Sequence, residues 1–268
     1  MTTTDTTDST PRSFFLPDGD RYIPTAWTQS GWDANSLRGG AISGLLMHEV
    51  ERRHLDPEFQ VARLTVDMFR LAPMVPLRVA TTVARDGGRI RVVDAVLIAD
   101  DQEIVRASVV MLRRTDPPEG DVWSPPTWEV PHPDTLPVSS WGEGRLPIWE
   151  RRYISGNPAD GGAPAPKRAW LQDVAAFLGD DPPSPLVRAA MISDSASPFA
   201  NSGAHGLNYV NADTTLYLHR APIGEWIGIE VVAHHSTAGI AIGECALYDL
   251  DGSFGRTSVC AIANRRRG

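Results

Sequence analysis

Apolar and polar positions repeat in the same order in two long stretches of the chain. Residues 38–53 and 186–199 both show the spacing of an amphipathic helix, and four alternating or β-branched segments follow each of them. The pattern predicts one helix followed by four antiparallel strands in each half. The predicted strands cover residues 62–71, 77–86, 89–100 and 103–114 in the first half, and 211–220, 225–234, 239–249 and 253–266 in the second.

The two halves also match at single residues. Arg70 and Arg106 have counterparts 150 residues later, at Arg220 and Arg256. A constant separation over several elements indicates a tandem duplication. One more strand before each helix, around 21–29 in the first half and around 148–156 or 167–172 in the second, makes each half β-α-β-β-β-β. We therefore expect an α+β fold in which each half is a long helix wrapped by a curved antiparallel sheet.

Proline and polar residues mark the expected boundaries. One segment between the halves is rich in proline, which donates no backbone hydrogen bond and interrupts helices. Its tryptophans, Trp123, Trp128 and Trp141, suggest that it lies against the protein surface. The N-terminus is polar and lacks the basic and apolar regions of a signal peptide. The units we expect are a disordered leader at 1–13, an N-terminal domain at 14–115, a linker at 116–147 and a C-terminal domain at 148–268.

Composition and charge narrow the possible functions. The 268 residues carry a formal net charge of −8, with 42% hydrophobic and 22% charged residues, which argues against a nucleic-acid partner. The chain has no apolar run of about 18 residues, so we expect no membrane span and a cytoplasmic location. The two cysteines, Cys245 and Cys260, are too few for a disulfide framework or a zinc site. We expect neither a metal nor an organic cofactor.

Asp194 occupies an unusual place in the predicted helix over 186–199. Ala190 and Met191 precede it by four and three residues, so the carboxylate falls on the apolar face. Burying an unpaired carboxylate costs several kcal/mol. Asp194 is therefore exposed by local geometry, neutralised by backbone donors or an arginine such as Arg188, or retained for chemistry.

Several motifs carry a family resemblance. They are DTTLYLHR (213–220), APIGEW (221–226), LYDLDG (247–252) and GRTSV (255–259) in the second half, and the looser RGG (38–40) in the first. With these motifs the chain resembles the double-hotdog acyl-CoA thioesterases, the type II acyl-CoA thioesterase family, over roughly residues 15–265. The resemblance implies two hotdog units whose sheets join edge to edge. It also implies that water cleaves an acyl-CoA thioester without metal or cofactor.

The resemblance further implies a composite catalytic site. Related hotdog enzymes place a His-Gly-Gly triplet at the helix N-terminus and an acid nine residues later. Residues 38–40 match the triplet, but the ninth position is Met47; the second half has Asp194, but Pro185 stands where the triplet would begin. Because the acid and the amides usually come from different units, one site would combine Gly40 with Asp194, which activates water. Alternatively, the glycines only let the helix cross its sheet closely.

In the family a hydroxyl residue and a glutamine assist the acid. Aligning the strands puts the hydroxyl at Ser236 or Thr237, next to His235, and puts Cys260 at the glutamine position. A thiol holds water poorly, so His235 has taken over, the substrate preference has moved, or activity is weak or lost. Cys260 as buried core filler is the alternative.

Other polar residues are candidates for positioning or substrate contact. Asn201 follows Asp194 by seven residues, and Asn211 and Asp213 lie near it in the sequence; for all three a turn or capping role is the alternative. Arginines suit the phosphates of coenzyme A, although solvated strand ends and a soluble tail are the favoured explanation for any single one of them. The substrate-binding candidates are Arg38, Gly39, Asn201 and Arg220, with Arg70, Arg265, Arg266 and Arg267 as further arginines.

The function that we predict is hydrolysis of a fatty acyl-CoA to the free acid and coenzyme A. A non-catalytic acyl-CoA or acyl-chain binding protein is the first alternative. The second is a hotdog enoyl-thioester hydratase, whose signature has a histidine five residues after an aspartate, whereas His205 is the first histidine after Asp194. The expected partner is the acyl-CoA substrate. We also expect a homodimer or higher homo-oligomer, because the outer sheet edges stay open.

Overall fold

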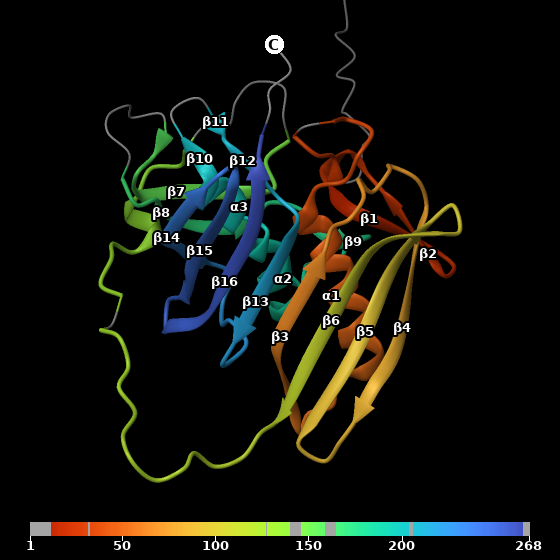
Figure 1. Ribbon diagram of the computed structural model, residues 1–268, viewed down its shortest axis with the longest axis horizontal. Coiled ribbons are helices and arrows are strands. Elements are labelled where there is room, and N and C mark those ends of the chain that lie inside the picture. The colour runs from red at the N-terminus through yellow and green to blue at the C-terminus, as the bar shows by residue number, and fades with distance from the viewer. Residues whose placement is uncertain are drawn as a thin grey trace, which may run out of the picture.

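The computed structural model describes residues 12–31, 33–126, 128–139, 146–158, 165–203 and 206–264. Most of its strands form one 14-stranded sheet, in the order β7-β8-β14-β15-β16-β13-β3-β6-β5-β4-β2-β1-β9, with β12 paired to β16. The helices α1 and α2 lie behind this sheet in the view of Figure 1. The expected α+β class with antiparallel strands is thus observed, apart from the one parallel pair, β1 with β9.

The first half follows the predicted order, except that two strands precede the helix where one was expected around 21–29. After the strands β1 and β2 and a short 3-10 helix, α1 and four antiparallel strands agree closely with the segments expected from the alternation of polar and apolar residues. The bounds are β1 Ser13–Asp18, β2 Arg21–Pro24, η1 Ala26–Thr28, α1 Gly39–His54, β3 Phe59–Asp67, β4 Leu77–Asp86, β5 Ile90–Ala99 and β6 Gln102–Arg113.

The second half differs in its helix. The helix predicted over 186–199 is two helices, because α2 ends at Ser193 and α3 begins at Ala196. Pro198 explains the break, since a proline ring collides with the carbonyl four residues earlier in a continuous helix, here that of Asp194. The bounds are η2 Pro133–Thr135, β7 Trp149–Ser155, β8 Arg168–Asp173, β9 Ala176–Leu178, α2 Pro185–Ser193, α3 Ala196–Asn201, β10 Ser202–Gly203, β11 Gly206–Leu207, β12 Tyr209–Asn211, β13 Asp213–Leu218, β14 Ile227–Thr237, β15 Ile240–Asp249 and β16 Gly252–Ala263.

The halves meet in the middle of the sheet, where β3 pairs with β13. Thr65 lies directly opposite Thr215, and the Oγ1 atoms of the two threonines are 3.2 Å apart. These residues are 150 positions apart, which is the period of the sequence repeat. Antiparallel strands place equivalent residues opposite each other only at a two-fold axis. The repeat found in the sequence is therefore also a repeat of the sheet.

The two longer helices cross at glycines. A Cβ atom on Gly44 would lie 2.6 Å from Cγ of Met191, and one on Gly40 would lie 2.7 Å from the Met191 carbonyl oxygen. Leu45 and Leu46 of α1 are fully buried in the core that fills the space between helices and sheet. The absence of side chains at Gly40 and Gly44 brings α1 and α2 into backbone contact. This crossing fixes where the C-terminal end of α2 lies relative to α1.

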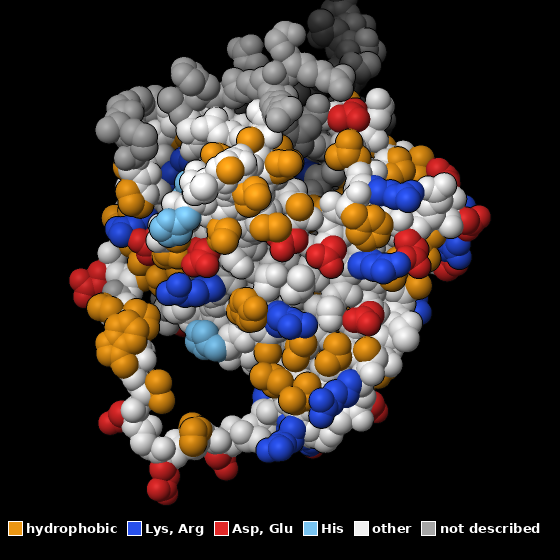
Figure 2. Space-filling model, in the orientation of Figure 1, with side chains coloured by type: hydrophobic (Ala, Val, Ile, Leu, Met, Phe, Trp, Pro, Cys, Tyr) orange, Lys and Arg blue, Asp and Glu red, His pale blue; other side chains and the backbone are white. Residues whose placement is uncertain are grey.

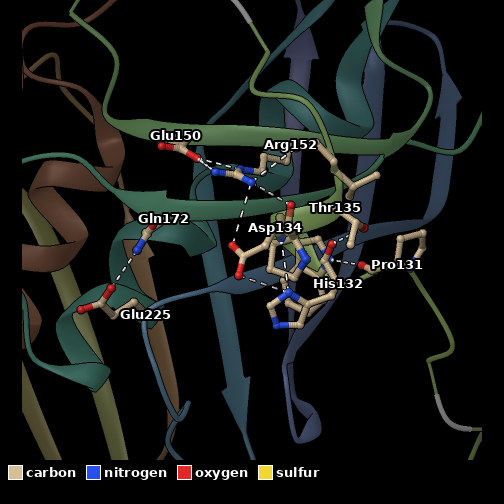
Figure 3. A network of polar contacts seen from close by, with 11 residues as sticks. Pro131, His132, Asp134, Thr135, Glu150, Arg152, Gln172 and Glu225 are labelled. Atoms are coloured by element: carbon tan, nitrogen blue, oxygen red, sulfur yellow. Dashed lines mark hydrogen bonds and ion pairs between the residues drawn. The ribbon is translucent and has the colours of Figure 1, made fainter.

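The proline-rich segment between β6 and β7 is fixed to the second half at its later part. The Trp128 ring stacks on Tyr248, with 4.1 Å between ring centroids. Trp170 Nε1 donates to the Pro131 carbonyl (3.1 Å), and Arg152 Nη1 donates to the Pro133 carbonyl (2.9 Å; Figure 3). These contacts hold residues 128–135 against β7 and β8.

The earlier part of this segment stands away from the sheet. An opening between it and the body of the protein is visible in the space-filling view (Figure 2), and Trp123 is 83% exposed. The expectation that the tryptophans hold the segment to the surface is thus met by Trp128 but wrong for Trp123; Trp141 lies outside the described residues. Within the described part of the chain, no helix is both long and apolar enough to cross a membrane.

Replacing Trp128 should release the proline-rich segment. We expect Trp128→Ala to lower the free energy of unfolding by about 1–3 kcal/mol, because the variant loses the stacking on Tyr248 and its share of buried apolar surface. Trp123→Ala is the matched control in the same segment and should change stability by less than about 0.5 kcal/mol. Urea denaturation of both variants measures the difference, and equal effects would contradict the assigned anchor.

Candidate functional site

The N-terminus of α1 offers amides without partners inside the helix. The first N–H groups of any helix lack intrahelical acceptors. Here Arg38 at the N-cap donates from its Nε to the Gln29 carbonyl (2.7 Å), and its side chain has no acceptor that could cap the first-turn amides. The Gly40 N–H instead donates to the carboxylate of Asp194. The helix end thus faces a negatively charged group, which its dipole favours.

Asp194 reaches this helix end from the C-cap of α2. Its carboxylate lies over the α-carbon of Gly39, where a Cβ would be 2.6 Å from Oδ1 and 2.8 Å from Cγ. Asn211 Nδ2 donates to Oδ1 of Asp194 from the end of β12, at 3.0 Å. Only glycine at position 39 leaves room for the carboxylate, so the pair depends on both halves of the chain.

The surroundings make the Asp194 carboxyl more basic than an exposed aspartate. Burial raises its pKa, while the hydrogen bonds from Asn211 and Gly40 and the charge of Arg38 oppose that rise. The side chain is half-buried, and its accessible part faces a cavity. A carboxylate with a raised pKa beside a cavity is suited to accept a proton.

The cavity beside Asp194, here called the Asp194 cavity, has a volume of about 720 Å³. Its walls combine apolar side chains with a few polar groups, as small-molecule sites usually do. Arg38, Gly40 and Asn211 contribute the polar groups near Asp194. The apolar lining includes Ile148, Trp149, Met191 and Phe199.

The structure brings together four of the residues expected from the sequence. Arg38, Gly39 and Gly40 come from the first half and Asp194 from the second, and they meet at one end of the Asp194 cavity. Their geometry unites a potential base with the amides of a helix N-terminus. The roles of these residues stay predictions until they are tested.

Three other expected residues lie elsewhere. His235, Ser236 and Thr237 are exposed at the end of β14, where they pair only with β15. None of the three lines the Asp194 cavity. Their exposure shows that these side chains point to solvent and do not approach the carboxylate.

Cys260 also faces away from the site. On β16 its neighbours Val259 and Ala261 are buried, whereas Cys260 is exposed on the opposite face of the strand, and its N–H donates to Asp213 Oδ1 at 2.7 Å. Successive side chains of a strand point to opposite faces. The interpretation of Cys260 as buried core filler is therefore wrong, and the thiol does not face Asp194.

Asn201 and Arg220 have other partners. Asn201 Oδ1 contacts His234 Nδ1 at 3.0 Å, so its side chain does not hold Asp194. Arg220 forms an ion pair with the buried Asp249 (2.5 Å) and ties the end of β13 to the hairpin of β15 and β16. Arg70 donates to Gln102 (2.9 Å). Arg265, Arg266 and Arg267 lie outside the described residues.

Asn211 is the site residue that the sequence did not single out. It was noted only as a polar residue near Asp194 with a turn role as the alternative, yet its side chain holds the carboxylate. No spacing rule links residues 17 apart across a turn and two short strands. In the described part of the chain, no group of three or more His, Cys, Asp or Glu side chains is placed to hold a metal ion.

Comparison with protein families matches both halves. A model of the acyl-CoA thioesterase N-terminal domain matches residues 28–112, and a model of the acyl-CoA thioesterase C-terminal domain matches residues 120–258. No curated protein matches the chain.

Solved structures show the fold. The tesB protein of Mycobacterium avium subsp. paratuberculosis has a TM-score of 0.70 at 17% identity, over 94% of this chain and 96% of that one. A protein of unknown function with a hot dog fold from Alicyclobacillus acidocaldarius has a TM-score of 0.72 at 18% identity, over 94% and 96%. The acyl-CoA thioesterase II TesB2 of Mycobacterium marinum has a TM-score of 0.63 at 17% identity, over 91% and 98%. The chain therefore has a hotdog fold.

Removing the charge of Asp194 should stabilise the protein. Because the pKa is raised on folding, the folded state binds more protons than the unfolded state at pH values between the two pKa values, and stability falls as pH rises through that window. We expect Asp194→Asn to be more stable than the natural chain at neutral pH, with a difference that shrinks toward pH 4. Urea denaturation from pH 4 to 8 measures this; the exposed Asp18→Asn is the control, and a destabilised Asp194→Asn would contradict the assignment.

Proposed function

We propose that this chain, which belongs to the acyl-CoA thioesterase family, hydrolyses acyl-CoA thioesters in the Asp194 cavity. The observation that carries the proposal is the contact between the Asp194 carboxylate and the N-terminus of α1. It places a proton acceptor beside the amides of a helix N-terminus, next to a cavity with apolar walls. A thioester needs those three features for attack by water.

In the proposed reaction Asp194 accepts a proton from a water molecule while the water oxygen attacks the thioester carbon. Negative charge develops on the carbonyl oxygen, and the first turn of α1, which includes Gly40, stabilises it through its amides and dipole. The tetrahedral intermediate then expels the sulfur of coenzyme A. The departing sulfur takes the proton from Asp194, which leaves the free acid, the thiol and the regenerated carboxylate.

Asn211 acts as a positioning residue in this proposal. Its amide holds Oδ1 of Asp194 at 3.0 Å, so the carboxylate cannot rotate freely and one oxygen is kept available for water. The apolar wall of Ile148, Trp149 and Phe199 is suited to the acyl group, since those side chains remove apolar surface from water.

We further propose that the chain is a tandem hotdog with units at 14–115 and 148–268 and a linker at 116–147. The pairing of Thr65 with Thr215 on an apparent two-fold axis supports it. A single composite site then takes its amides from the first unit and its acid from the second. Self-association of the whole chain through the open sheet edges stays a prediction.

Hydrolysis is tested by the release of free thiol from acyl-CoAs of several chain lengths. We expect Asp194→Asn to lower kcat by about 10²–10⁴-fold with little change in KM, because the variant keeps the shape of the side chain and loses its proton acceptor. Asp18→Asn should behave as the natural chain. If natural chain and variant both bind acyl-CoA and neither releases thiol, the protein is a binding module and the proposal fails.

The contact with Gly39 gives a second test. We expect Gly39→Ala to lower kcat/KM by at least about 10²-fold, because the added Cβ displaces the carboxylate by a distance on the order of 1 Å. Gly88→Ala is the matched control, since a Cβ at that position meets nothing within 4 Å. Equal activity of both variants would show that the position of Asp194 over Gly39 does not matter for turnover.

A further inference from the structure

A second cavity lies on the other side of α3 from the Asp194 cavity. It has a volume of about 430 Å³ and lies between α3, β12, β14 and the residues that precede β8. Hydrogen-bond donors gather in it, and the described lining contains neither Asp nor Glu. The polar side chains that matter for the argument are those of Lys167, Asn201 and His234. We call it the Lys167 cavity.

Lys167 is the only lysine in the chain. It is half-buried, and its Nζ donates to the carbonyl oxygens of Phe199 and Ser202, each at 2.8 Å. An ammonium group has three N–H donors, so one remains without an acceptor among the described residues. Burial lowers the pKa of Lys167, and the described lining of the cavity contains no carboxylate that could pair with it. A desolvated charge of this kind is costly unless an opposite charge joins it.

Asn201 adds a second unsatisfied donor. The residue is 2% exposed, and its Oδ1 is engaged with His234 Nδ1 at 3.0 Å. Its buried Nδ2 has no hydrogen-bond partner in the described residues. A buried donor left unpaired is unfavourable, and a ligand with an acceptor oxygen would satisfy it.

We propose that the Lys167 cavity binds an oxyanion group, a carboxylate or a phosphate, between Lys167, Asn201 and His234. The donors of the cavity supply positive charge and amide hydrogens, whereas the described lining supplies no side-chain carboxylate to balance them. An oxyanion presents several acceptor oxygens and the missing negative charge. This site is separate from Asp194, and the proposal does not depend on thioester hydrolysis.

The competing explanation is that Lys167 only stabilises the C-terminal end of α3. Its two carbonyl partners belong to Phe199, in the last turn of α3, and to Ser202, the C-cap. A cation is favourable at this end of a helix. That explanation leaves the donor of Asn201 unsatisfied and predicts no response to added anions. The proposal predicts a saturable response, so binding measurements separate the two.

The single lysine allows a direct measurement. Protein labelled with ¹³C-lysine gives one Cε signal in a proton–carbon correlation spectrum, and that signal reports on Lys167 alone. We expect sodium phosphate or sodium acetate to shift it along a saturable curve. Sodium chloride at the same ionic strength should produce no saturable shift. A response to phosphate and acetate no larger than that to chloride, with no saturable shift from coenzyme A either, would overturn the proposal.

Variants of residues in and near the cavity test whether the shift of the Lys167 signal arises from an anion bound there. Asn201→Asp places a carboxylate of similar size beside the donors, so it should abolish the saturable shift; His234→Gln should raise the dissociation constant by at least about tenfold. Arg168→Gln is the matched control, because it removes the neighbouring positive charge, which is paired with Glu230 outside the cavity. A saturable shift that survives in Asn201→Asp would place the anion elsewhere and refute the proposal.

Coenzyme A serves as a separate arm of the titration because it carries phosphate groups. If it alone shifts the signal saturably, and Asn201→Asp abolishes the shift, the oxyanion is supplied by the substrate arm. If phosphate or acetate also does so, the site accepts a free anion. Both results support the proposal. Thiol release is measured on the same samples, so that anion binding in the Lys167 cavity and thioester hydrolysis are tested separately.

Discussion

The fit of the Asp194 carboxylate over the α-carbon of Gly39 is the constraint on which the site depends. It needs a helix that begins with two glycines, and it needs α2 to end where Asp194 can reach them. Gly40 and Gly44 meet the second need, because their missing side chains let α1 and α2 touch through backbone and Met191. The same contacts that pack the core therefore also fix the position of the acid relative to the amides.

The alternation of polar and apolar residues was enough to predict the four long strands of each half, but not the short strands β1 and β9 to β11. The strands β3 to β6 and β13 to β16 coincide with segments in which polar and apolar residues alternate and which turns separate. The break between α2 and α3 was missed, although Pro198 was visible in the sequence. The helical spacing of apolar residues continues across Asp194, although the α-helix is interrupted there. Hydrophobic periodicity therefore could not reveal the break.

The candidate site could be predicted only where it depends on short spacing. The glycines at the start of α1 and the acid near the end of α2 stand out in the sequence, and they meet in the structure. The predictions for the strand residues 235–237 and Cys260 were wrong for a different reason. A shift of one residue in a strand moves a side chain to the other face, and Cys260 sits between two buried neighbours. Asn211 needed the tertiary structure, because its contact joins two segments that no motif connects.

The N-termini of α1 and α2 differ in how their amides are capped. At the start of α2, Ser184 caps the Val187 amide (3.2 Å) and its hydroxyl donates to Glu51 of α1 (2.5 Å). A side chain of the protein therefore occupies the position that corresponds to the open end of α1. A cap from its own helix satisfies the donors of α2, whereas the N-terminus of α1 meets the Asp194 carboxylate from the other half of the chain and borders the Asp194 cavity.

The threonine pair at the centre of the sheet has a consequence for shortened genes. A copy of the first half alone would still present β3 with Thr65 at its midpoint, and two such copies would form the same ladder with each other. Their helices would supply two sets of glycine amides and no aspartate. Such a symmetric pair would lack the contact between the Asp194 carboxylate and Gly39, which only the joining of two unequal halves supplies.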